Sequence, residues 1–243
     1  MRLLIVLLFW TSIASSQTII NSYAYEVVTL NNGLQARLDF DGNTNDAQGN
    51  TVTQPEGTAI TYISSLNGQA GVFGGDDALQ FTDVDLETEA YTVSVIFKRD
   101  AGGFQILSEL SRQVTNNHKG VNLWSNEVLS NETLIDENPP YIIVDDTNYI
   151  SSLNTSDGDW YHAIGVYDGT TYSLYFDDSA TAAVSGTDAS NGLTGDGIVY
   201  IGGRPDNSSE FLTGAIDMVA WWNRALTAAE IAQEFANYNS TND

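Results

Sequence analysis

The feature that most constrains the fold is a series of short β-strand segments joined by turn residues. Two apolar and aromatic runs, residues 160–167 and 171–176, flank the dipeptide Asp168-Gly169, which is typical of a tight hairpin. Similar runs recur along the chain, with Gly, Asn, Asp and Ser between them. They are residues 34–40, 78–81, 91–98, 104–107, 121–124, 141–144, 198–201 and 212–221. Many short strands without alternating helices predict an all-β fold, a two-sheet antiparallel sandwich or jelly roll.

The segment 211–235 changes from a strand to a helix. Residues 216–221 are almost all apolar, so we expect a strand that is buried on both faces. Thr227 and Glu230 then form a capping box, and apolar residues follow with helical spacing, which predicts one short C-terminal helix. Asp217 is the exception within the strand, because a buried carboxylate needs a partner or a metal ion.

The first 16 residues have the pattern of a secretory signal peptide. Arg2 is followed by the apolar run LLIVLLFW and then by small residues, and this run is too short to span a membrane. We therefore expect an exported, extracellular protein that does not insert into a membrane. Residues 17–33 form a polar lead-in, 34–238 a single domain and 239–243 a polar tail.

The charge of the chain restricts its partners. The formal net charge is −24, which argues against nucleic acid and anionic membranes. Clustered carboxylates suit calcium, although a solubility role alone would also explain the charge. The chain has no cysteine, so an apolar core, helped by any bound metal, must stabilise an exported fold.

Four blocks of the sequence resemble, in order, the laminin-G-like and concanavalin A-like jelly-roll family of lectins and glucanases. They are residues 38–50, 68–81, 159–178 and 200–235. The resemblance implies the fold but no single function, because this fold carries lectins, adhesion modules, glycoside hydrolases and lyases. The chain lacks the cysteine pair of some members, and its loop 126–140 is longer and more acidic than usual.

The first loop of the domain is a candidate calcium site. Five Asp and Asn side chains fall within residues 39–46, and calcium takes six to eight oxygen ligands. The resemblance implies a structural calcium ion between this loop and the aspartate of the last strand. The predicted ligands are Asp41, Asn43, Asp46 and Asp217. The alternative is an Asx-rich turn whose side chains bond their own backbone.

Aromatic residues beside the acidic loop are the candidates for ligand binding. Trp124, Tyr141 and Tyr149 flank the loop 126–140 and could stack against sugar rings, although an ordinary core role is the alternative. Trp160, Trp221 and Trp222 lie in strands that match core blocks of the family, and we expect at least two of these three to be buried.

Evidence for catalysis is weaker, and no catalytic residue is assigned. Asp83, Asp85, Glu87 and Glu89 form a D-x-D-x-E-x-E ladder, which differs from the glycosidase order and is typical of a solvated edge. His162 matches a structural position of the family, and His118 has no supporting motif for a lyase.

These observations lead to one principal hypothesis and two alternatives. The principal one is a secreted, non-catalytic module that recognises a polysaccharide, a cell-surface glycan or a cell-surface protein, stabilised by calcium. The alternatives are a glycoside hydrolase or polysaccharide lyase, and a structural subunit of an extracellular assembly that associates with itself.

Overall fold

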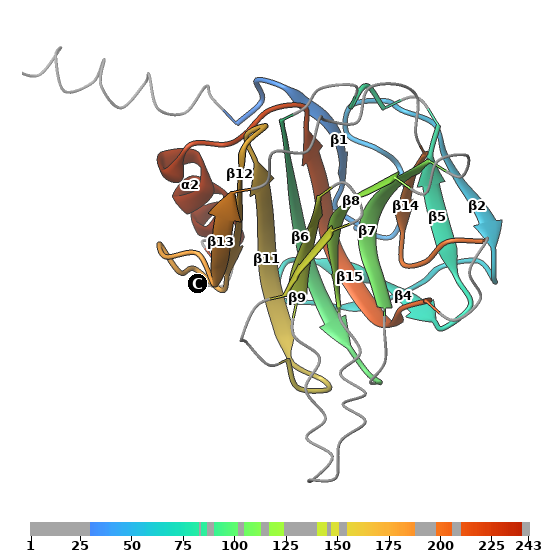
Figure 1. Cartoon of the computed structure of the whole chain (residues 1–243). Coiled ribbons are helices and arrows are strands. Elements are labelled where there is room, and N and C mark those ends of the chain that lie inside the picture. Colours follow the sequence, from blue (N-terminus) through green and yellow to red (C-terminus); the bar gives the residue numbers. More distant parts are fainter. Residues whose placement is uncertain are drawn as a thin grey trace, which may run out of the picture. The chain divides into compact units, whose positions relative to one another are not determined.

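Two antiparallel β-sheets face each other across an apolar core in the computed structural model of the chain (Figure 1). Residues Leu34–Asp243 form one compact unit. The structure describes residues 30–82, 84–86, 90–101, 105–112, 117–123, 140–144, 147–150, 155–187, 198–205 and 210–239. No helix within these residues is long and apolar enough to cross a membrane.

The first sheet has eight strands, seven in one continuous order and β1 paired with β15. In that order they are β13 (Val184–Thr187), β12 (Thr171–Phe176), β11 (Trp160–Tyr167), β6 (Tyr91–Arg99), β15 (Thr213–Trp222), β4 (Gln69–Gly74) and β3 (Thr61–Ser64), with β1 at Leu34–Leu38. The hairpin predicted around Asp168 is confirmed, because β11 and β12 pair antiparallel on either side of it.

The second sheet has seven strands. In order they are β10 (Thr147–Ile150), β9 (Pro140–Val144), β8 (Asn117–Leu123), β7 (Gln105–Arg112), β14 (Ile198–Ile201), β5 (Ala78–Phe81) and β2 (Val52–Glu56). The prediction of a two-sheet antiparallel sandwich is confirmed. The sequence did not reveal β2, whose Pro55 suits only an edge strand, and β2 indeed ends this sheet.

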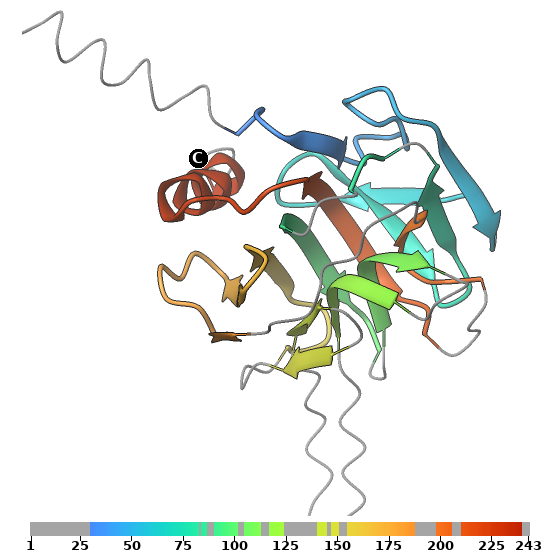
Figure 2. The same cartoon turned by 45° about the horizontal axis from the view of Figure 1, so that its top comes forward.

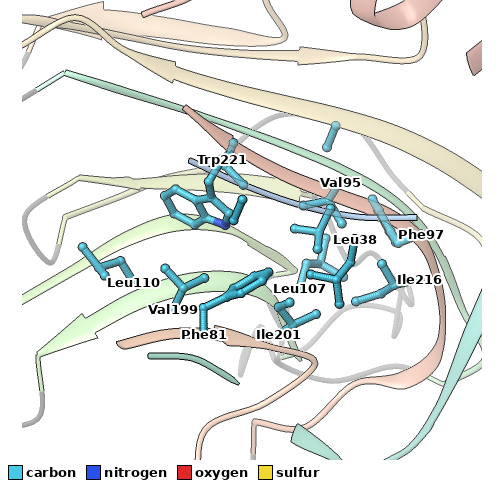
Figure 3. Packing of buried hydrophobic residues seen from close by; sticks show 14 of the residues in the cluster. Leu38, Phe81, Val95, Phe97, Leu107, Leu110, Val199, Ile201, Ile216 and Trp221 are labelled. Carbon is cyan, nitrogen blue, oxygen red and sulfur yellow. The ribbon is translucent and has the colours of Figure 1, made fainter. Parts of the chain in front are cut away.

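The core lies between the inner faces of the two sheets (Figure 3). Val95 and Phe97 of β6 point into it from the first sheet, and Leu107 and Val199 meet them from the second. Trp221 also belongs to this core, and its indole Nε1 donates a hydrogen bond of 2.8 Å to Ser108 Oγ on the opposite sheet. This bond links β15 to β7 across the sandwich.

The helix α2 (Ala228–Asn239) packs against the outer face of the first sheet (Figure 2). Thr92 and Ser94 alternate with the core residues of β6 and are buried on this outer side. The hydroxyl of Thr92 accepts a hydrogen bond of 3.0 Å from the backbone N–H of Leu226, just before the helix. Phe235 of α2 lies edge-on to the ring of His162, 4.6 Å between centroids.

The predicted capping box at the start of α2 is confirmed. The backbone N–H of Glu230 donates to Thr227 Oγ1 at 3.3 Å, and the N–H of Thr227 donates to Glu230 Oε2 at 2.8 Å. Arg224 adds two hydrogen bonds to the same carboxylate, at 2.7 and 2.9 Å. The Arg224 bonds, together with those from Thr227, lower the pKa of Glu230 from 4.5 to about 2.

Replacing Glu230 with Gln is expected to destabilise the protein by about 2 kcal/mol at pH 7, because the charge-assisted bonds to Arg224 are lost. Since the folded-state pKa is depressed, this stabilisation is present above pH 4.5 and disappears as the pH falls towards 2. Urea unfolding at several pH values measures the difference from wild type. The exposed Glu56, changed to Gln, is the control for loss of charge. A difference that stays constant down to pH 2 would contradict the assignment.

Candidate functional site

Strand β15 contains a β-bulge at Asp217. Phe97 of β6 pairs with Ile216, whereas its neighbour Ile96 pairs with Met218, so Asp217 is an extra residue in β15. Ile216 and Val219 both belong to the core cluster, while Asp217 and Met218 both line a cavity on the other face. The expected burial of the strand on both faces is confirmed, but its regular alternation is interrupted at this residue.

The cavity beside the bulge, which we call the acidic cavity, has a volume of about 250 Å³. Five segments that are distant in the sequence meet there: β1 with the loop that follows it, the turn between β3 and β4, β6, the bulge of β15, and α2. Most of the polar side chains that line it carry oxygen. They are Asp39, Asp41, Asn67, Asp217, Glu234, Asn237 and Tyr238, with Arg37 as the single cation of the lining.

Asp217 is the most deeply buried carboxylate of the predicted ligand set, with 2% of its surface exposed. Its Oδ1 accepts a hydrogen bond of 3.1 Å from Ser65 Oγ, whereas Oδ2 has no hydrogen-bond partner of normal geometry in the described part of the chain. Burial, and then the nearby charges of Asp41 and Asp39, raise the pKa of Asp217 to about 7 against the opposing effect of the Ser65 and Tyr238 hydroxyls. The group therefore ionises only partly at neutral pH and would gain from a cation.

Glu234 adds a second buried carboxylate to the acidic cavity. Its side chain is 2% exposed, and Oε1 lies 3.4 Å from Nη1 of Arg37. Arg37 is shared, because its Nε also binds Asp39 Oδ1 at 2.8 Å. Burial raises the pKa of Glu234, and the charge of Arg37 partly opposes this. One guanidinium thus serves two carboxylates, and the cavity keeps an excess of acidic groups.

The turn between β3 and β4 holds Asp41 against the acidic cavity. Asp41 Oδ1 accepts a hydrogen bond of 3.0 Å from the backbone N–H of Gln69. Gly68 precedes this residue with φ at +90°, and a Cβ there would lie 2.1 Å from Asp41 Oδ1. A larger residue at position 68 would therefore displace the carboxylate as well as strain the turn.

The other two predicted metal ligands, Asn43 and Asp46, do not line the acidic cavity. Asp46 accepts hydrogen bonds from the backbone N–H groups of Arg37 (2.6 Å), Gln48 (3.0 Å) and Asn50 (2.9 Å). Asn43 Oδ1 accepts from the N–H of Asn45 at 2.8 Å. Both side chains brace their own loop, as the Asx-turn alternative describes. The structure thus brings together Asp41 and Asp217 from the predicted set.

The chemistry of the acidic cavity fits a hard cation. Its ligands would be carboxylate and amide oxygens, and Oδ2 of the buried Asp217 has no hydrogen-bond partner of normal geometry among the described residues. Within the described residues, no three His, Asp or Glu side chains are close enough together to hold a metal ion by themselves. Calcium also accepts amide oxygens, backbone carbonyls and water. Asp41 and Asp217, with Asn67 nearby, are the residues that would hold it.

The sequence did not reveal Glu234 and Tyr238 as members of this site. Both lie on α2, and each is within four residues of an apolar side chain on the buried face of that helix, so each can share that face. A charged residue at such a spacing is a signal of a buried polar contact, but its partner cannot be found without the packing of α2 on the sheet.

Most of the predicted ligand-binding and catalytic candidates fall wholly or partly outside the described residues. Trp124, most of the loop 126–140 and three members of the acidic ladder do so, while Asp85 is exposed. Tyr141 lies on β9 and Tyr149 on its partner β10, the edge strand of this sheet, and only the backbone of these two residues is described. The tryptophan prediction is confirmed, because Trp221 and Trp222 are buried.

The chain belongs to the concanavalin A-like lectin/glucanase superfamily, because the superfamily's laminin G family model matches residues 73–232. The match covers β4 to the middle of α2 and includes Asp217. The family resemblance and the jelly-roll prediction are thereby confirmed. No curated protein sequence is significantly similar to the chain.

Solved structures share the fold at low sequence identity. Domain 4 of AbnA, an extracellular GH43 arabinanase from Geobacillus stearothermophilus solved with arabinotriose, is 19% identical with a TM-score of 0.67, over 82% of this chain and 97% of that one. A Trypanosoma rangeli sialidase is 16% identical with a TM-score of 0.62, over 86% of this chain and 33% of that one. Botulinum neurotoxin type C is 10% identical with a TM-score of 0.57, over 87% of this chain and 53% of that one. This chain therefore spans about a third of the sialidase and half of the toxin chain.

Proposed function

We propose that the protein is an exported, non-catalytic glycan-binding module stabilised by a calcium ion in the acidic cavity. The observation that carries the proposal is the likeness to domain 4 of the arabinanase, which the chain matches over 97% of that domain's length and which was solved with arabinotriose. Cell entry of botulinum neurotoxin type C depends on interaction with two ganglioside molecules, which supports a glycan as the partner class.

The proposed calcium ion has a structural role. Asp41 belongs to the loop after β1, Asp217 to the last strand, and both face the same cavity as α2. A cation held by both carboxylates would join the two ends of the domain and offset the burial of Asp217. An exported chain without disulfides would gain most from such a link.

An array of neutral and sialylated oligosaccharides, including arabinotriose and ganglioside headgroups, tests the proposed function. We expect the protein, purified from the medium of an expression host, to bind at least one glycan class in calcium, and to bind it more weakly in EDTA. N-terminal sequencing of the same material should start at Gln17. Binding to no glycan would refute the glycan-binding function, and release of shorter saccharides would favour the hydrolase alternative.

A further inference from the structure

A second cavity lies beside the acidic cavity and has a different chemistry. We call it the aromatic cavity; its volume is about 300 Å³, and its walls include Trp160, Tyr161, Asp177, Asp178, Phe235 and Tyr238. We propose that the aromatic cavity is the binding subsite for a neutral saccharide. This proposal rests on the proposed glycan-binding function and deepens it, because it names the site and the kind of sugar.

Hairpin pairing and helix packing hold the walls of the aromatic cavity in place. Ala163 of β11 pairs with Phe176 of β12, so the start of β11 lies beside Asp177 and Asp178. The backbone N–H of His162 donates a hydrogen bond of 2.8 Å to Asp177 Oδ1. From the other side, the ring of His162 lies against Phe235 and against Tyr238, whose ring centroid is 5.7 Å away. A strand, a turn and a helix thus position the walls before any ligand binds.

The lining of the aromatic cavity combines the two kinds of group that recognise sugars. Trp160 is half-buried, so part of its surface remains accessible to the apolar C–H face of a pyranose or furanose, whereas the ring of Tyr161 is held by packing on Phe97 and Phe176. Asp177 and Asp178 are exposed at the rim and supply carboxylate oxygens as acceptors for sugar hydroxyls. An apolar and aromatic pocket with a few placed polar groups is the usual form of a small-molecule site.

The two rim aspartates share an uncommon backbone conformation. Their φ values are +45° for Asp177 and +69° for Asp178, in the left-handed region that few residues other than Gly, Asn and Asp adopt. Asp177 is exposed, but its carboxyl group is partly buried; this partial burial and the neighbouring charge of Asp178 raise the pKa of Asp177, against the opposing hydrogen bond from the backbone N–H of His162. Two adjacent carboxylates in such a turn would bind a hydroxyl-rich ligand and repel an anionic one.

A third cavity, of about 490 Å³, shares Tyr161 and Asp177 with the aromatic cavity. It follows the turn between β12 and β13, where Ser179 and Thr181 add hydroxyl groups. Ligand sites commonly have volumes of about 300–1,000 Å³, so the two cavities together suit an oligosaccharide better than a single sugar. The two aspartates and the net charge of −24 favour neutral over sialylated or uronic chains.

Two substitutions test the aromatic cavity directly. Replacing Trp160 with Ala removes an aromatic wall, and replacing Asp178 with Asn removes an acceptor charge while keeping a residue that tolerates φ of +69°. Titration calorimetry with the neutral oligosaccharide that binds tightest on the array should show each variant weakened by about tenfold. The exposed Glu56, changed to Gln on the other sheet, is the control and should bind like wild type.

The outcomes separate this proposal from the proposed function. If Trp160→Ala lowers the thermal midpoint, weaker binding by that variant could come from unfolding. Asp178→Asn alone then tests the subsite, because it preserves the backbone conformation of the turn. Wild-type binding that both variants retain would overturn the subsite and leave the glycan-binding function standing, with the site elsewhere. Tighter binding of sialylated than of neutral oligosaccharides would overturn the assignment to neutral sugars. Absence of wild-type binding to every glycan would refute both proposals.

Discussion

Replacing Asp217 with Asn is expected to stabilise the calcium-free protein at pH 8 and to abolish its stabilisation by calcium. The folded-state pKa of Asp217 is raised from 3.8 to about 7, so folding favours the protonated carboxyl. Protonation of Asp217 therefore contributes to the free energy of unfolding. This contribution is complete below pH 4 and is lost as the pH rises through 7. At pH 8 the calcium-free wild type therefore carries a penalty of up to about 4 kcal/mol that a neutral amide avoids.

Calcium should reverse the order of stability of the two proteins. A cation at 100 times its dissociation constant adds about 2.7 kcal/mol to the folded wild type, and the variant lacks the charge that holds it. Thermal unfolding in EDTA from pH 4 to 8, and again in calcium, measures both effects. For a domain of this size the calcium-free difference corresponds to a midpoint shift on the order of 10 °C.

Two further variants serve as controls for the calcium experiment. Asp41→Asn should lose the calcium response with little change in EDTA, because Asp41 is exposed. Asp46→Asn should lower stability equally in EDTA and in calcium, since Asp46 braces its own loop. A calcium response that survives in Asp217→Asn, or that disappears in Asp46→Asn, would refute the proposed ligands.

Replacing Trp221 with Ala is expected to destabilise the protein by about 3–5 kcal/mol, which would unfold a domain of ordinary stability at moderate temperature. The side chain is fully buried, packs on Tyr91 at 5.8 Å between ring centroids, and bonds to Ser108 on the opposite sheet. Its loss would leave a cavity where the two sheets meet and an unsatisfied hydroxyl in the core.

A double-mutant cycle separates the hydrogen bond of Trp221 from its packing. Trp221→Phe keeps an aromatic ring but leaves the buried Ser108 hydroxyl without its donor. Adding Ser108→Ala removes the unsatisfied group and should recover part of the loss. Urea unfolding of the two single variants and of the double variant gives the coupling energy. Strictly additive losses would show that the bond contributes nothing beyond packing.

The sequence predicted the sandwich because its long central strands carry a strong pattern. The runs that form β6, β11 and β15 are rich in β-branched and aromatic residues, which is the composition expected of buried strands. The strands β2, β3, β4, β10 and β13 were not predicted. All of them except β4 end a sheet, where one side lacks a partner and polar residues or proline are tolerated.

The candidate site was only partly predictable. Asp217 stood out as a charge in an apolar strand, and the family resemblance supplied Asp41 as its partner. The participation of Arg37 and Glu234 depends on the packing of α2 against β1, which no local pattern specifies. Asn43 and Asp46 lie outside the acidic cavity and bond to the backbone of their own loop, which the sequence could not foresee because an Asx-rich turn and a calcium loop have the same composition.

Because of the bulge at Asp217, β15 has one residue more than its pairing with β6 requires, and this extra residue does not belong to the core. Because Ile216 and Val219 face inwards on either side of it, removal of a single residue would leave every core position in register with β6. An acidic position can therefore appear or vanish between family members by a one-codon insertion or deletion. A gap at this point in an alignment would mark the gain or loss of the site, while the jelly roll around it stays the same.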